Sequence, residues 1–186
     1  MSVDILDIFT EMGIDTRPDS ELTHEEILAR NVRVVDLHFH TENPDEVEKA
    51  VALYTDDIVW EAPSRGVIMT DRQSVLDSYR KIFQTLAYRK AISLRRFATE
   101  QFVFDDQIAE LVVVGDPSLM PNLPFETGDS ISVRLVHCFE LRDGRIAREI
   151  AYELWRKKGS LVDNDFIPDG SPIETFPPIP GFPEDS

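Results

Sequence analysis

The sequence predicts an α+β fold in which three N-terminal helices pack on one face of a curved, mainly antiparallel sheet. Apolar residues recur with the helical period up to about residue 86 and with the two-residue period of strands after residue 88. The clearest pair of strands flanks Asp143-Gly144, a dipeptide typical of tight hairpin turns. The helices precede most of the strands, so together they can cover one face and leave a cone-shaped interior.

Capping residues and proline mark where the helices begin. Thr23 and Glu26 have the spacing of a capping box, Pro44 suits the first turn of a helix, and Asp71 suits an N-cap. The predicted helices cover residues 3–12, 24–41, 45–54 and 71–86. The first of them belongs to an N-terminal extension over residues 1–22.

The remaining chain is predicted to form strands, one loop and one arm. The predicted strands cover residues 58–62, 90–104, 107–114, 130–142 and 145–157. Asp105-Asp106 is interpreted as a turn between two of them. The apolar loop over 115–129 is expected to act as a lid or a subunit contact, or to pack on its own sheet. The main domain should span 23–158, and a proline-rich arm over 159–186 should dock on it or on a second subunit.

The hairpin turn decides which residue faces His137, the one ionisable side chain on the apolar face of its strand. A two-residue turn would place it opposite Ile150 and send Glu149 outward to solvent. A three-residue loop over 142–144 would place it opposite Glu149, within hydrogen-bonding reach. We favour the three-residue loop, which makes His137 and Glu149 the candidate acid–base pair. A purely structural histidine is the alternative on pattern alone.

Composition limits the classes of partner and cofactor. The net charge of −16 argues against nucleic acid and against anionic membrane surfaces, because both require clustered Lys and Arg. The single cysteine, Cys138, excludes an intrachain disulfide. We expect no cofactor, because no glycine-rich phosphate loop occurs. We expect no metal, because His38 and His40 lack a third ligand nearby in sequence. Without a long apolar run, a cytoplasmic protein is expected.

Two segments resemble the NTF2-like superfamily, and more closely its SnoaL-like polyketide cyclase branch. Val51–Pro63 reads VALYTDDIVWEAP and resembles the ALYADDVVWxxP signature of the superfamily. Leu123–Glu149 reads LPFETGDSISVRLVHCFELRDGRIARE and resembles the PPTGRxVxxxxxHxFRFxDGKIxE pattern of the branch. The resemblance covers roughly residues 25–155 and implies the cone-shaped NTF2-like fold. It does not fix a reaction, because the superfamily includes cyclases, isomerases, dehydratases, epoxide hydrolases and non-catalytic subunits.

The resemblance assigns His137 to the pocket histidine of the cyclases. It places Ala151 where their catalytic aspartate stands, which casts doubt on the standard cyclase mechanism. Glu149 or Glu153, each two residues away on the same face of the strand, could take that role.

Relative to the ketosteroid isomerases, His38 stands at the oxyanion-hole tyrosine and Ala62 at the base aspartate. Isomerase chemistry by that base is therefore not expected.

These observations define a candidate site inside the cone. The catalytic candidates are His137, Glu149 and His38. The expected pocket residues are Trp60, Tyr79, Leu135, Phe125, Glu153 and Glu61. Glu149 would remove a proton next to a carbonyl, with its pKa raised by burial, and His137 would hydrogen-bond the developing oxygen.

The expected function is a cofactor-independent acid–base enzyme acting on a small hydrophobic carbonyl compound by ring closure, isomerisation or dehydration. A non-catalytic ligand-binding module or a structural subunit is the alternative.

The outward face of the sheet predicts self-association. In the favoured register it carries Val136, Cys138, Ile146, Ile150, Tyr152 and Leu154. Large exposed apolar patches usually mark interfaces. We therefore expect a homodimer through this face.

Overall fold

The fold was analysed in a computed structural model that describes residues 5–183. Its helices are α1 (Ile5–Glu11), α2 (His24–Thr41), α3 (Val47–Ala52) and α4 (Arg72–Thr85). Its strands are β1 (Tyr54–Ala62), β2 (Val67–Met69), β3 (Leu86–Ala98), β4 (Phe102–Val113), β5 (Ser130–Arg142), β6 (Arg145–Lys157) and β7 (Ile173–Thr175). Residues 3 and 4 of the predicted first helix lie outside the described part of the chain.

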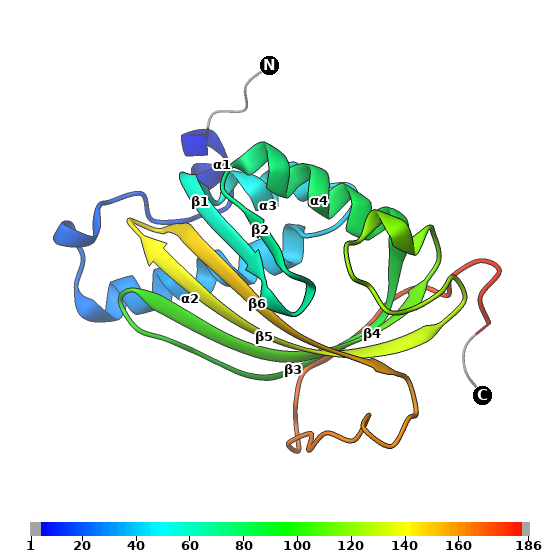
Figure 1. The fold of residues 1–186 in the computed structure, drawn as a ribbon. Coiled ribbons are helices and arrows are strands. Elements are labelled where there is room, and N and C mark those ends of the chain that lie inside the picture. The colour runs from blue at the N-terminus through cyan, green and yellow to red at the C-terminus, as the bar shows by residue number, and fades with distance from the viewer. Residues whose placement is uncertain (1–4, 184–186) are drawn as a thin grey trace.

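The strands form a single curved sheet in the order β2-β1-β6-β5-β4-β3-β7. All neighbouring pairs are antiparallel except β1 and β6. The helices lie on one side of this sheet, and the connection between β6 and β7 hangs on the opposite side (Figure 1). The architecture is therefore the predicted α+β arrangement of helices on a mainly antiparallel sheet.

The capping signals located the helices well. The hydroxyl of Thr23 accepts a hydrogen bond from the backbone N–H of Glu26, and the Glu26 carboxylate accepts one from the backbone N–H of Thr23. Asp71 caps α4 by accepting from the backbone N–H of Ser74 at 2.8 Å. The helix predicted over 45–54 is shorter, because Tyr54 already belongs to β1.

The predicted turn at Asp105-Asp106 is wrong. Both residues are buried inside β4, and the chain reverses instead over residues 99–101. Asp105 accepts a hydrogen bond from Arg96 at 2.8 Å, and Asp106 accepts from Arg134. Arginines on the neighbouring strands β3 and β5 compensate the buried charges, and a reading of local sequence cannot detect such partners.

The hairpin turn between β5 and β6 is a two-residue loop, not the three-residue loop that we favoured. Asp143 and Gly144 have φ values of 48° and 70°, which is the positive-φ geometry of a type I′ turn. Arg142 accordingly pairs with Arg145. This register alone would have turned Glu149 outward.

A β-bulge returns Glu149 to the inner face of the sheet. One residue of β6, Ala147, has no cross-strand partner. Past this bulge His137 pairs with Ala151, and Glu149 pairs with Phe139. The predicted direct pairing of His137 with Glu149 is therefore wrong, but the two side chains still share one face, because the extra residue shifts the alternation.

The same bulge corrects one residue of the predicted outward face. Ile146 is fully buried in the core beneath the helices. Tyr152 and Leu154, beyond the bulge, are 51% and 59% exposed on the outer face. Association of two chains through this outer face stays a prediction.

The loop before β5 packs at one end of the sheet, and the C-terminal arm crosses its outer face. Met120 in the loop is buried against Leu86, Leu111 and Val133 at one end of the sheet. The arm crosses the outer face, where Asp165 pairs with Arg134 and Arg156. It then joins the edge of the sheet through β7, which pairs with β3.

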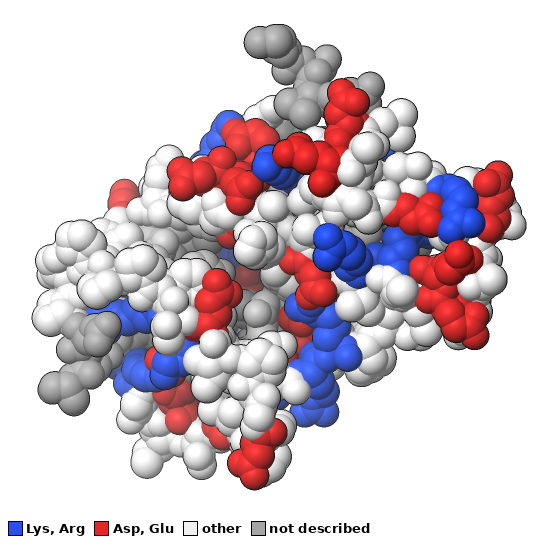
Figure 2. All heavy atoms as spheres, turned by 180° about the vertical axis from the view of Figure 1, so that it is seen from behind, with Lys and Arg blue, Asp and Glu red and all other residues white. Residues whose placement is uncertain are grey.

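On the face shown in Figure 2, basic side chains lie among acidic ones and form no continuous basic surface. None of the helices within residues 5–183 has the length and apolar character needed to cross a membrane.

Candidate functional site

An inner cavity of about 50 Å³ lies between the sheet and the helices. Six of the predicted site residues line it: Trp60, Tyr79, Leu135, His137, Glu149 and Glu153. They come from β1, α4, β5 and β6, whose inner faces converge there. Alternation along β5 directs its side chains to this face, and the bulge at Ala147 does the same for those of β6.

Glu149 is the centre of a buried hydrogen-bond network. Its carboxylate is 1% exposed and accepts a hydrogen bond of 2.5 Å from the hydroxyl of Tyr54. That hydroxyl lies 3.0 Å from the hydroxyl of Tyr79. His38 Nε2 lies 3.4 Å from Glu149 Oε2, so helix α2 contributes a histidine to the same carboxylate.

His137 approaches the other oxygen of this carboxylate. Its Nε2 lies 4.0 Å from Glu149 Oε1, and its Nδ1 lies 3.8 Å from Asp105 Oδ2. Both distances are longer than a hydrogen bond. Both are still short enough for strong attraction between opposite charges. The ring stacks on Phe139 at 5.6 Å and contacts the edge of Phe39 at 5.1 Å, so its position is fixed by packing.

Electrostatics in this cluster favour an ionised Glu149 beside protonated histidines. Burial alone would raise the pKa of Glu149, but His38, His137 and the Tyr54 hydrogen bond hold that pKa below its ordinary value. Burial would lower the pKa of His38 and of His137, but the neighbouring carboxylates hold both above the ordinary value. The expectation that the pKa of Glu149 is raised is therefore wrong.

The carboxyl group with a raised pKa is Glu42, at the C-terminal end of α2. Burial raises the pKa of Glu42 to about 7, and the charge of Glu149 adds to the rise while His38 and His137 oppose it. Glu42 Oε2 lies 3.5 Å from His38 Nε2. His38 thus lies between the two carboxylates, and one of them titrates near neutral pH.

Both carboxylate oxygens of Glu153 accept hydrogen bonds, and its side chain forms part of the cavity wall. It accepts two hydrogen bonds from the guanidinium of Arg65, at 2.8 and 2.9 Å. It also accepts one from the hydroxyl of Ser64 and one from the indole N–H of Trp155. With both oxygens held in this way, Glu153 is a poor candidate for the base.

Two expected pocket residues lie outside the cavity. Glu61 faces the other side of β1, where it accepts hydrogen bonds from Arg148 at 2.6 and 2.8 Å. Phe125 packs on Trp155, with ring centroids 6.5 Å apart, and Met120 is the loop residue that lines the cavity. The loop therefore closes this end through Met120.

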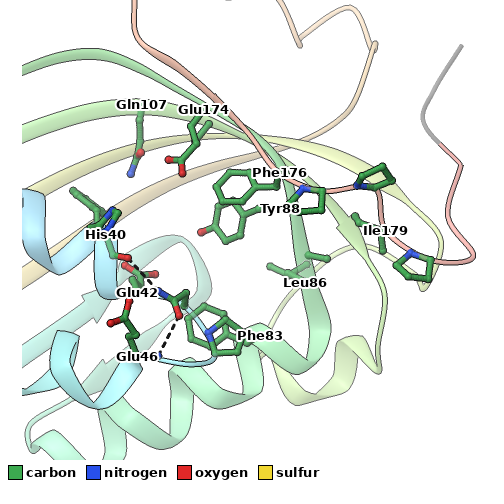
Figure 3. A pocket seen from close by; sticks show the side chains of 18 residues that line it. His40, Glu42, Glu46, Phe83, Leu86, Tyr88, Gln107, Glu174, Phe176 and Ile179 are labelled. Atoms are coloured by element: carbon green, nitrogen blue, oxygen red, sulfur yellow. Dashed lines mark hydrogen bonds between the residues drawn. The ribbon is translucent and has the colours of Figure 1, made fainter.

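A larger outer chamber of about 700 Å³ adjoins the inner cavity. Glu42, Leu86 and Tyr88 line both spaces. The C-terminal arm supplies one wall of the chamber, with Phe176 and Ile179 facing Phe83 and Leu86 across it (Figure 3).

The sequence matches a known domain family. The sequence model of the SnoaL-like domain matches residues 32–149, more than half of the chain. The chain belongs to the SnoaL-like domain family. No curated protein matches the sequence.

Solved structures share the fold at low sequence identity. A protein of Xanthomonas campestris pv. campestris assigned as a polyketide cyclase is 18% identical, with a TM-score of 0.57 over 68% of this chain and 91% of that one. An NTF2-like protein of Burkholderia xenovorans is 14% identical, with a TM-score of 0.56 over 68% and 91%. An LEH-like epoxide hydrolase of M. tuberculosis is 16% identical, with a TM-score of 0.53 over 68% and 84%.

Three residues of this SnoaL-like site were not among the sequence candidates. Tyr54 falls at the end of the helix predicted over 45–54, Asp105 falls in the predicted turn, and Glu42 has no predicted role. The signal for Tyr54 was its position in the ALYTDD segment, and Asp105 is one of two adjacent acids in a strand that is mostly apolar. Nothing in the local sequence marks Glu42, because its raised pKa comes from burial next to His38 and Glu149.

His38 and His40 do not act together. His38 is fully buried beside Glu149, whereas His40 is exposed and lines the outer chamber. Within residues 5–183 no group of three or more His, Cys, Asp or Glu side chains is arranged to hold a metal ion.

Proposed function

We propose that this SnoaL-like protein is an acid–base enzyme that moves a proton next to a carbonyl group of a small hydrophobic molecule. The observation that carries the proposal is the Glu149 carboxylate, buried in an otherwise mostly apolar cavity between His38 and His137. A buried charge is costly unless the site holds it in place, so keeping one at the cavity wall suggests a chemical role.

Glu149 is the base in this mechanism. It is ionised at neutral pH and takes a proton from the carbon next to the substrate carbonyl. The electron pair of that C–H bond moves toward the carbonyl oxygen, where negative charge develops. His137, held protonated by Asp105 and Glu149, donates a hydrogen bond to that oxygen. Return of the proton to another carbon gives isomerisation, and departure of a hydroxyl group on the next carbon, which takes the proton from Glu149 and leaves as water, gives dehydration.

His38 and Glu42 provide a path for the proton. His38 Nε2 lies 3.4 Å from Glu149 and 3.5 Å from Glu42, which faces the outer chamber. Because the pKa of Glu42 is about 7, this group can gain or lose a proton at neutral pH. Glu42 thereby resets the protonation of the buried pair between turnovers.

The small size of the inner cavity favours the alternative that the protein is a structural subunit. A space of about 50 Å³ holds only a few heavy atoms, and small-molecule sites usually measure about 300–1,000 Å³. A subunit with a largely filled interior, in which the network around Glu149 is structural, would have such a cavity.

Hydrogen–deuterium exchange distinguishes the two functions without knowledge of the natural substrate. A panel of cyclic and open-chain ketones is incubated with the protein in D₂O, and deuterium uptake at the α-carbon is followed by NMR. We expect Glu149→Gln to lower the enzyme-dependent exchange by about 10²–10⁴-fold, the usual effect of losing a general base.

Glu140→Gln is the matched control, because Glu140 lies on the outer face of β5 and pairs with Arg148 at 3.4 Å. It should leave the exchange unchanged. The wild-type rate should fall as pH rises above 6.5 through the raised pKa of His137, because the neutral ring stabilises the oxyanion less well. No exchange above background in any ketone, or equal loss in both variants, would favour the structural alternative.

A further inference from the structure

The outer chamber is where most of a ligand must lie. Its volume of about 700 Å³ is typical of small-molecule sites, whereas the inner cavity of about 50 Å³ admits only the end of a molecule. The two spaces meet at Glu42, Leu86 and Tyr88. These three side chains separate the two spaces, so a ligand with its body in the chamber reaches Glu149 only past them.

A buried donor in the inner cavity also indicates that a ligand enters. The indole N–H of Trp60 is buried, and its partner is the side chain of Tyr79, with which it makes no hydrogen bond of good geometry. Trp60 lines the inner cavity. A poorly satisfied buried N–H is destabilising, and a carbonyl oxygen on the entering end of a ligand would satisfy it.

The charged residues of the chamber determine the charge of the ligand. Its lining includes the carboxylates of Glu42, Glu46 and Glu174, and no Lys or Arg side chain among the described residues. Glu46 is paired with Lys49 at 3.0 Å. Glu174 carries an exposed carboxylate at the edge of the chamber, and Glu42, next to His38, is partly ionised near neutral pH because its pKa is about 7 (Figure 3). An anionic ligand would be repelled here, and a cation would be attracted.

Aromatic rings complete a cation site. Tyr88 and Phe176 lie together, with ring centroids 5.5 Å apart, next to Glu174 (Figure 3). Phe39 and Phe83 also line the chamber. Carboxylates together with aromatic faces are the usual recognition elements for an organic ammonium group, while the faces also accept an apolar body.

The arm that builds this wall lies outside the part of the chain that matches the family. Glu174 belongs to β7, and Phe176 donates its backbone N–H to the carbonyl of Arg89 at 3.0 Å. The family match ends at residue 149. The wall that contains Glu174 and Phe176 therefore lies outside the matched domain, whereas Glu42 and Tyr88 lie within it.

We infer that the outer chamber binds an organic ammonium group, so that the substrate is an amphipathic amine whose carbonyl-bearing end reaches the inner cavity. The statement about the carbonyl end rests on the proposed function. The ammonium site can be tested separately, because binding requires no turnover.

Three probes of similar shape and different charge test the site by isothermal titration calorimetry on the full chain. They are benzyltrimethylammonium, its neutral isostere neopentylbenzene, and the anion 3-phenylpropanoate. We expect the cation to bind at least 10-fold more tightly than the neutral probe and the anion to show no binding. Glu174→Gln should weaken binding of the cation about 5-fold or more and leave the neutral probe unchanged.

Glu25→Gln is the control for the general negative charge of the protein. Glu25 is an exposed carboxylate in the first turn of α2, far along the helix from the chamber, and its loss changes the net charge by the same amount. Equal weakening by Glu25→Gln and Glu174→Gln would overturn the inference, as would equal affinity for the cation and its neutral isostere.

The variant Glu149→Gln separates this inference from the proposed function. It should bind the ammonium probe like the wild type, because Glu149 lines only the inner cavity. Ammonium binding without any α-carbon exchange would leave the inference standing and refute the enzyme. Exchange without preference for the cation would do the reverse.

Discussion

Replacement of Glu42 by glutamine should stabilise the protein, and only above a certain pH. Burial raises the pKa of Glu42 from 4.5 to about 7 in the folded state. Each unit of pKa difference corresponds to 1.36 kcal/mol, so ionised Glu42 costs the fold up to about 3 kcal/mol. The figure is an upper limit, because the side chain is 16% exposed.

The pH dependence of this stability difference follows from the upward shift of the pKa of Glu42. Below pH 4.5 the carboxyl is protonated in both the folded and the unfolded state, so its titration does not affect stability. Between pH 4.5 and about 7 it is ionised in the unfolded state but still protonated in the fold, and stability falls as pH rises. Glutamine does not titrate. The advantage of Glu42→Gln should therefore grow over this range and level off above it.

Urea denaturation of both proteins at several pH values from 4 to 8 measures this difference, with Glu25→Gln as a surface control. We expect little difference at pH 4 and a gain of about 1–3 kcal/mol at pH 8. A gain independent of pH, or a loss at pH 8, would refute the reasoning. A loss would mean that protonated His38, 3.5 Å away, stabilises the Glu42 carboxylate in the fold.

Two further substitutions test the walls of the site. Arg65→Met removes the buried partner of Glu153 and should lower the free energy of unfolding by about 3–5 kcal/mol, because an uncompensated buried carboxylate remains. A loss below 1 kcal/mol in chemical denaturation would show that water reaches Glu153. Tyr54→Phe removes a hydrogen bond to the ionised Glu149 and should cost about 1.5–3 kcal/mol. It should also raise the pKa of Glu149 in a carboxyl ¹³C NMR titration, and an unchanged pKa would argue against that bond.

Local sequence was sufficient for the helices and for the inner face of β5. A capping box closes within four residues, so Thr23 and Glu26 fixed the start of α2 without help from the rest of the fold. Alternation along β5 likewise placed Leu135, His137 and Phe139 on one face, because the period of a strand is a local property. The sequence therefore identified the α+β architecture and six of the sixteen residues that line the inner cavity.

The tertiary structure decided which side chains come together where strands and helices meet. The bulge at Ala147 brings Glu149 back to the face of His137 despite a two-residue turn, because one extra residue reverses the alternation. Asp105 lies in a strand rather than a turn because Arg96, on the neighbouring strand, compensates its charge.

The raised pKa of Glu42, the contact of His38 with Glu149 and the chamber closed by the arm all depend on segments far apart in sequence. The sequence alone determined which side chains of β5 face inward, whereas the bulge determined this for β6. Only the packing of helices, sheet and arm decided which of them meet, because burial and charge interactions depend on distances in space rather than on positions along the chain.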